Sequence, residues 1–191
     1  MDEKHRDRHK SKQQLYATDK KGKPTGEIID RWDAHSGSGV KHLAFVIFVL
    51  NKEGEFVLHK RPGRKVGGKK WDTPASHILE GETKEKAMTR CLEEEYGTGG
   101  KLEFDHFPGF SYEEKYDDGT CENEYCLVSI CKYGGKITPN PEEVEGIKKL
   151  PAKQALGEWE KNSKEYTIWF NMAIELLSND KKGRKYLGIK K

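Results

Sequence analysis

The sequence lacks the long apolar segments with which proteins enter or cross membranes. No apolar run approaches the roughly 18 residues of a transmembrane helix. The opening residues MDEKHRDRHKSK contain none of the apolar stretch typical of a secretory signal peptide. We therefore expect neither a membrane partner nor secretion.

Cysteine is scarce and is not arranged in pairs. The chain has four cysteines, at Cys91, Cys121, Cys126 and Cys131, and no two of them form a CxxC pair. This spacing argues against a disulfide framework and against a zinc knuckle. A reducing, cytoplasmic location is the simplest expectation.

The sequence also lacks a large excess of charge of either sign. The net charge of +3 over 191 residues is too small to predict nucleic-acid binding. The length suits one domain with a real core. We expect a disordered polar tail at 1–13, a single domain at 14–178 and a solvated basic tail at 179–191. The sequence does not indicate an oligomeric state.

The clearest strand signal is the continuous apolar run at 43–50, which predicts a strand buried on both faces. A turn at 51–54 and a hairpin partner at 56–59 follow it. Residues 61–70, RPGRKVGGKK, then form a basic, glycine-rich loop. Further strands are expected at 125–131 and 136–138.

A helix is predicted at 83–96, and a second helix at about 166–177. In the first, a stripe at helical spacing comprises Ala87, Met88, Cys91, Leu92 and Glu95. Thr83 suits the N-cap, and Gly97 suits a left-handed residue after the helix. Strands mixed with two main helices indicate an α+β fold, an α/β/α sandwich.

The end of the first helix is unusually acidic. Carboxylates there are mildly destabilising, because the helix C-terminus carries partial negative charge. Glu95 lies on the stripe that faces the core, where an unpaired carboxylate is very costly, so we expect a cation near it. Glu94 is placed to pair with Arg90, and Glu93 is expected at the surface.

A second acidic pair, Glu122 and Glu124, would share one face of a strand, because side chains alternate. Two such carboxylates can converge on a metal; two acids on a wet edge strand would explain the pair equally well. Three histidines, His35, His42 and His77, offer ligands that suit transition metals, although each alone is more often an ordinary histidine.

The basic loop supplies cations together with backbone N–H groups exposed by glycine. Its cations are Arg61, Arg64, Lys65, Lys69 and Lys70. Such groups suit a polyphosphate. Acids that hold metals, combined with this loop, point to a small organic diphosphate as the substrate.

The segment 71–97 resembles the box of the Nudix superfamily, which reads G-x5-E-x7-R-E-U-x-E-E-x-G with U aliphatic. The matching residues are Glu82, Arg90, Leu92, Glu94, Glu95 and Gly97. Ser76 stands at the first glycine, and Cys91 replaces the glutamate after the arginine. The resemblance implies a Nudix fold, with a mixed sheet between helices.

Within the superfamily the chain looks like the type I isopentenyl-diphosphate isomerase branch. The likeness rests on HLAF from His42 with His35 seven residues earlier, on Ser76-His77, on FSY ending at Tyr112, and on ENE at 122–124. It implies one metal, with Mn²⁺ or Zn²⁺ as options, held by His35, His42, His77, Glu122 and Glu124.

The resemblance also assigns roles around the substrate. Glu95 would help to bind a second metal, Mg²⁺, that bridges to the diphosphate, and Arg61 and Lys65 would meet the phosphates. Trp169 would face a carbocation. Glu124 would transfer a proton, with Tyr112 beside it.

One departure divides the functional hypotheses. The isomerases carry a cysteine just before the Ser/Gly-His pair, and here that position is Ala75, which cannot transfer a proton. A Mg²⁺-dependent hydrolase of this branch needs no such thiol, although the loss of the acid at Cys91 counts against it. It would use Glu94 and Glu95, with Glu122 or Glu124 as additional ligand or base. The alternatives are an altered isomerase and a silent diphosphate-binding domain.

Overall fold

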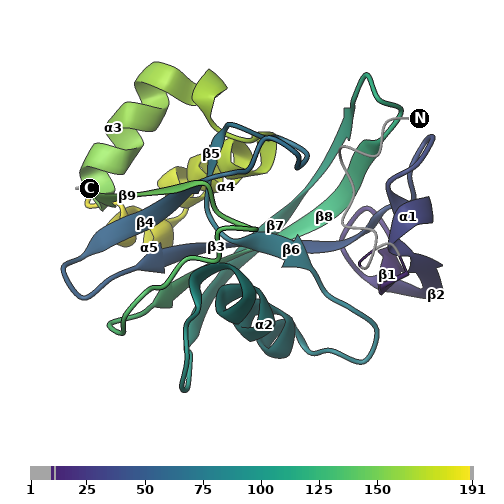
Figure 1. Cartoon of the computed structure of the whole chain (residues 1–191), viewed down its shortest axis with the longest axis horizontal. Coiled ribbons are helices and arrows are strands. Elements are labelled where there is room, and N and C mark those ends of the chain that lie inside the picture. The colour runs from purple at the N-terminus through teal and green to yellow at the C-terminus, as the bar shows by residue number, and fades with distance from the viewer. Residues whose placement is uncertain (1–9, 11, 190–191) are drawn as a thin grey trace.

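A mixed nine-stranded sheet with helices against both faces organises the computed structural model, which describes residues 10 and 12–189 (Figure 1). The strands are β1 Gln14–Thr18, β2 Pro24–Asp30, β3 His42–Leu50, β4 Glu55–Lys60, β5 Trp71–Asp72, β6 Ala75–His77, β7 Phe104–Lys115, β8 Cys121–Lys132 and β9 Gly146–Pro151. The helices are α1 Arg31–Ala34, α2 Lys84–Tyr96, α3 Ala152–Asn162, the 3₁₀ helix η3 Ser163–Glu165, α4 Ile168–Asn179 and α5 Lys181–Tyr186. This is the predicted α/β/α arrangement.

Strand β3 is the centre of the sheet. It runs parallel to β8 over its whole length and antiparallel to β4, β6 and β1. Its side chains alternate between two cores, as a strand buried on both faces requires. Val46 and Phe48 pack toward α4, whereas Phe45 and Ile47 pack toward α2. The prediction for 43–50 and its hairpin partner is confirmed.

Helix α2 forms at the predicted place because both its ends are capped. The Thr83 hydroxyl accepts a hydrogen bond from the Lys86 amide, and Gly97 adopts a left-handed φ of 59°. The predicted stripe, Ala87, Met88, Cys91, Leu92 and Glu95, is buried, while Glu93 is exposed. A buried carboxylate therefore does lie at the end of α2.

The structure differs from the prediction in several segments. Residues 136–138 form no strand, because the Thr138 amide bonds the Tyr96 carbonyl at the end of α2 instead of a neighbouring strand. Strand β9 and helix α3 lie in a region where no element was expected. The tail at 179–191 is not only a solvated end, since it forms α5 and places Leu187 in the core.

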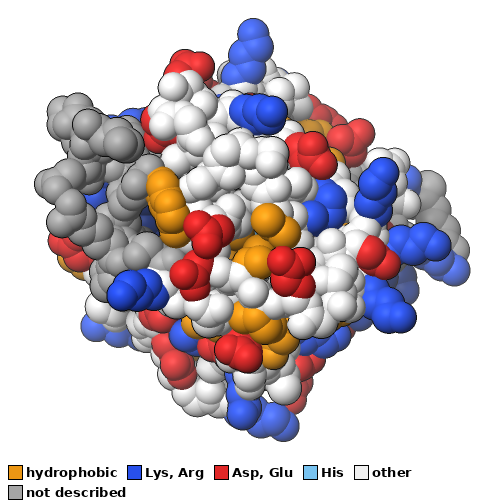
Figure 2. All heavy atoms as spheres, turned by 90° about the vertical axis from the view of Figure 1, so that its right-hand side faces the viewer, with side chains coloured by type: hydrophobic (Ala, Val, Ile, Leu, Met, Phe, Trp, Pro, Cys, Tyr) orange, Lys and Arg blue, Asp and Glu red, His pale blue; other side chains and the backbone are white. Residues whose placement is uncertain are grey.

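The described helices and one face of the molecule bear on the membrane and charge expectations. None of the described helices is long and apolar enough to cross a membrane. On the face at the β1–β2 end, acidic and basic side chains are interspersed (Figure 2), which accords with the net charge of +3.

Candidate functional site

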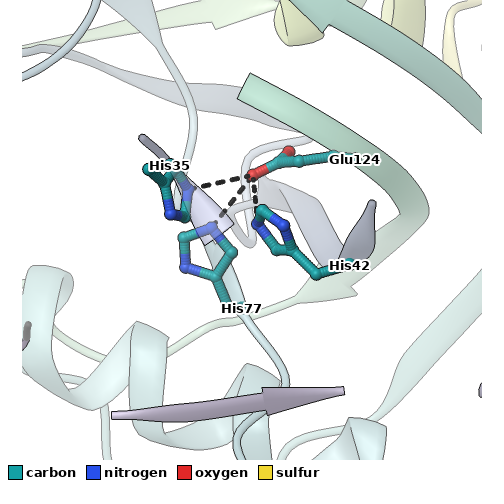
Figure 3. Close-up of side chains that lie close together, drawn as sticks. All are labelled: His35, His42, His77 and Glu124. Atoms are coloured by element: carbon teal, nitrogen blue, oxygen red, sulfur yellow. Dashed lines mark hydrogen bonds and ion pairs between the residues drawn. The ribbon is translucent and has the colours of Figure 1, made fainter. Parts of the chain in front are cut away.

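Pairing within the sheet brings three of the predicted ligands together. In the register of β3 and β8, His42 lies directly opposite Glu124, and Ala44, two residues further on, pairs with His77 of β6. Residues i and i+2 share a face of a strand, so these side chains project from one face. His35, just after α1, completes the group (Figure 3). One ligand atom from each of the four residues lies within 4.8 Å of the others.

Hydrogen bonds to backbone carbonyls orient two of these imidazoles. Nδ1 of His35 lies 2.8 Å from the Arg31 carbonyl oxygen, and Nδ1 of His42 lies 2.7 Å from that of Val40. A carbonyl only accepts, so each Nδ1 carries the hydrogen. The Nε2 lone pair of each neutral ring is then left to face the cluster, as in metal-ligating histidines.

Those lone pairs point at carboxylate oxygens, which are also acceptors. His42 Nε2 is 3.5 Å from Oε1 of Glu124, is fully buried, and has no hydrogen-bond partner among the described residues. His35 Nε2 is 3.2 Å from Oε2 of Glu122. Facing acceptors require a proton or a cation between them. Three imidazoles and a carboxylate fit a divalent transition metal.

The two acids of the ENE segment differ in their surroundings. Glu124 is near His77, whose Nε2 lies 2.9 Å from its Oε1, and accepts a 2.7 Å hydrogen bond from the Tyr112 hydroxyl. Although burial opposes it, the neighbouring imidazoles of His42 and His77 hold the pKa of Glu124 well below its usual range. Burial and the charge of Glu124 raise the pKa of Glu122. Glu122 joins the cluster through His35, not as one of its four central groups.

A cavity of about 180 Å³ connects this cluster to the end of α2. Glu94, Glu95, Arg61 and Lys65 line it together with three members of the cluster, His35, His77 and Glu124. Burial raises the pKa of Glu95 to about 7, although the charges of Lys65 and Arg61 oppose the rise. Its Oε2 is buried with no hydrogen-bond partner among the described residues. This end therefore combines cations for phosphate with carboxylates for a hard metal ion.

Two residues of this end were missed by the sequence reasoning. Lys10 comes from the segment expected to be disordered. Its Nζ lies 3.0 Å from Oε1 of Glu143 and 3.6 Å from Oε2 of Glu94. Glu143 is buried and also forms an ion pair with Lys65. The acidic run PEEVE at 141–145, opposite a basic loop, was the available signal for Glu143.

Part of the cavity wall is aromatic. Trp169, at the start of α4, has its ring centroid 6.4 Å from that of Tyr112, and both line the cavity. The indole Nε1 donates to Asp72, which is fully buried. Burial raises the pKa of Asp72, and the charge of Arg61 opposes that rise. Asp72 was not singled out from the sequence.

The two departures from the expected motifs lie in different environments. Ala75 lines the cavity, so a methyl group occupies this part of its wall. Cys91 lies on the buried face of α2, in the core, and does not line the cavity. Cys126, on β8 two residues after Glu124, also lines the cavity, and burial keeps its pKa well above the usual value.

Comparison with known proteins identifies the family. The family model described as NUDIX domain matches residues 40–170. The chain belongs to the Nudix family. It is 32% identical over 147 residues to the isopentenyl-diphosphate Delta-isomerase of Haloarcula marismortui, covering 74% of this chain and 78% of that protein. It is 30% identical over 178 residues to the isomerase of Photobacterium profundum, covering 88% and 96%.

Solved structures agree on the fold. DR0079 from Deinococcus radiodurans superposes with a TM-score of 0.62 at 17% identity, covering 85% of this chain and 96% of that one. The MutT protein of Methanosarcina mazei Go1 gives a TM-score of 0.57 at 16% identity, covering 71% and 91%. The chain therefore has a Nudix fold, and its sequence relatives include isomerases.

Proposed function

We propose that this Nudix protein is a metal-dependent hydrolase that cleaves a small organic diphosphate. The observation that carries the proposal is the composition of one cavity. Glu94 and Glu95 reach it beside Arg61 and Lys65, while Ala75 occupies the position where the resemblance to isomerases expects a thiol. The cavity thus has groups for holding metal and phosphate but lacks one of two acid–base groups needed to move a proton.

Each end of the cavity would take a different part of the substrate. Arg61 and Lys65 would hold the phosphate oxygens, and Glu94 and Glu95 would hold Mg²⁺. Tyr112 and Trp169 would contact the organic group. A volume of about 180 Å³ favours a small group over a dinucleotide. When bound, divalent cations stabilise charge on phosphate oxygens and lower the pKa of water.

The histidine cluster would hold a second cation, for which imidazole ligands favour Mn²⁺ or Zn²⁺ over Mg²⁺. Glu122 would serve as an additional ligand or as a base, because its Oε2 is buried without a hydrogen-bond partner among the described residues. Tyr112 would hold Glu124 in place through its 2.7 Å hydrogen bond.

An isomerase is the second candidate, and the assembled cluster favours it. His35, His42, His77 and Glu124 converge, and the curated relatives named above are isomerases. In this alternative Glu124 would be the surviving proton-transfer group, with Trp169 facing the positive charge of the intermediate.

One NMR experiment separates the candidates. The protein is incubated in D₂O with Mg²⁺ and Zn²⁺ and with isopentenyl, dimethylallyl and nucleoside diphosphates in turn. Phosphorus spectra detect cleavage, and proton spectra detect a shifted double bond. Phosphate release supports the hydrolase. Isomerisation without release contradicts it, and binding without either change indicates a silent domain.

A further inference from the structure

Asp72 is the shared acceptor of three side chains that lie around the cavity wall. Its Oδ1 accepts from the Thr167 hydroxyl at 3.0 Å, and its Oδ2 accepts from Arg61 Nη1 at 3.0 Å. The Trp169 Nε1 lies 3.0 Å from Oδ1 and 2.9 Å from Oδ2. The carboxylate is fully buried, so these donors take the place of water.

This shared acceptor fixes the phosphate-binding cation against the aromatic wall. The Arg61 guanidinium carbon lies 5.0 Å from the centre of the Trp169 ring, within the range of a cation–π contact. Arg61 Nε also donates to the Val66 carbonyl at 2.9 Å. Val66 and Asp72 thus use two of the five guanidinium N–H groups, and three remain for other acceptors.

Thr167 extends the same arrangement to the backbone. It is the N-cap of α4, and its hydroxyl oxygen accepts from the Phe170 amide while the hydroxyl donates to Asp72. Gly67, in the basic loop, packs at the edge of the Trp169 ring, where an added Cβ would lie 3.2 Å from the indole. The strand that carries Asp72, the basic loop and the start of α4 therefore meet at one carboxylate.

We propose that Asp72 is a positioning residue that sets the spacing between Arg61 and Trp169, and so couples recognition of the phosphate end of the substrate to recognition of its organic end. The inference rests on the proposed function, since it takes an organic diphosphate as the ligand. Asp72 itself touches no substrate. It acts by holding the guanidinium and the indole at one distance and in one orientation.

A role confined to stability is the competing explanation, and the consequences differ. A buried hydrogen bond that serves only folding stabilises the protein without changing ligand affinity. A carboxylate that orients Arg61 changes affinity for phosphate even when the protein stays folded. It also makes the loss caused by changing Arg61 depend on whether Asp72 is present.

The test measures binding of inorganic diphosphate with Mg²⁺ by calorimetry, using the full chain. Asp72→Asn keeps the shape and removes the charge, and Arg61→Lys removes the planar fork. Each change is expected to weaken binding about tenfold. The double variant should bind diphosphate no more than about twofold less tightly than the single variant with the lower affinity. Both changes disrupt the same arrangement, so their losses should not multiply.

Ser129→Ala is the matched control. Ser129 is fully buried and bonds His106 Nδ1 at 2.9 Å, but it does not line the cavity. This variant should lose stability and keep its diphosphate affinity. The indole N–H resonance of Trp169 is assigned by its loss in Trp169→Phe. Its chemical shift without ligand should change in Asp72→Asn and should not change in Ser129→Ala.

The outcomes distinguish failure of the positioning role of Asp72 from failure of the proposed function. Binding by Asp72→Asn within about twofold of wild type, or losses that multiply in the double variant, would overturn the positioning role. A wild-type protein that binds no diphosphate would overturn the proposed function. If Asp72→Asn does not fold, a cycle of Arg61→Lys and Trp169→Phe with isopentenyl diphosphate replaces it, and multiplying losses would again reject the inference.

Discussion

Arg90 donates a hydrogen bond to the backbone carbonyl of His77, with 3.0 Å between Nη2 and the oxygen. The same guanidinium bonds both oxygens of Glu82, at 2.7 and 2.9 Å, and Glu82 accepts from the Leu79 amide at 3.1 Å. Helix α2 thereby holds the segment that carries one imidazole of the cluster. Arg90 and Glu82, the arginine and the first glutamate of the Nudix box, therefore position the histidine site as well as the helix.

Glu82→Gln should destabilise the fold at neutral pH by roughly 1.5–3 kcal/mol, the range for hydrogen bonds to charged groups. Although burial opposes it, hydrogen bonds from Arg90 and Leu79 lower the pKa of Glu82 from its usual 4.5. Its stabilisation is therefore present above pH 4.5 and is lost as the pH falls through the lower folded-state pKa. Urea unfolding at pH 7 and at low pH measures this.

The matched control is Glu93→Gln, on the exposed face of α2. It should change the free energy of unfolding by less than about 0.5 kcal/mol at either pH. An equal loss in Glu82→Gln at both pH values would contradict the charge-based account of the Arg90 contact.

His42→Ala should remove the transition metal from the histidine cluster. Its Nε2 is buried and faces Glu124, so it should be a direct ligand. Metal analysis after dialysis against Zn²⁺ or Mn²⁺ should find about one ion per wild-type chain and much less in the variant. His106→Ala, outside the cluster, should keep the ion. Equal metal content in both variants would refute the site.

Glu143→Gln should strengthen binding of inorganic diphosphate. Its carboxylate pairs with Lys65 and Lys10 inside the cavity, where it competes with phosphate for the same cations. We expect a several-fold lower Kd, of order 1 kcal/mol, by calorimetry. Glu145→Gln breaks an exposed pair with Lys69 and should change little. Weaker binding in Glu143→Gln would mean that this carboxylate helps to hold the ligand.

Ala75→Cys should confer or raise isomerase activity. Ala75 lines the cavity, and the resemblance puts the isomerase thiol at this position. Proton NMR of isopentenyl diphosphate in D₂O should show a gain of at least about a hundredfold, the lower end of the range for a single acid–base group. Ala75→Ser serves as the control of similar size. No gain in Ala75→Cys would show that more than one group separates this cavity from an isomerase.

Local pattern predicted the central elements of the fold. The apolar run of β3, and the buried stripe and capping residues of α2, each predict their element from residues close together in the sequence. Strand β9, GIKKLP, and helix α3, which buries mainly Ala152 and Ala155, carry weak patterns. Ile137 suggested a strand, but its neighbours bond the end of α2 instead.

The residues of the candidate metal site could be found from their motifs, whereas the residues that support them could not. Asp72 forms hydrogen bonds with Thr167 and Trp169, which are 95 and 97 residues away in the sequence. No local pattern predicts contacts over such separations. Lys10 lies in a polar segment that is typical of disorder, and its role depends on Glu143, which follows 133 positions later in the chain.

The most direct test of the central claim is phosphate release from small organic diphosphates with Mg²⁺, comparing wild type with Glu95→Gln and Glu93→Gln. Glu95 is buried at the cavity, whereas Glu93 is exposed on the same turn of α2. The account predicts release by wild type and Glu93→Gln, and a loss of at least about a hundredfold in Glu95→Gln. No release by wild type from any of these substrates, or full activity in Glu95→Gln, would contradict it.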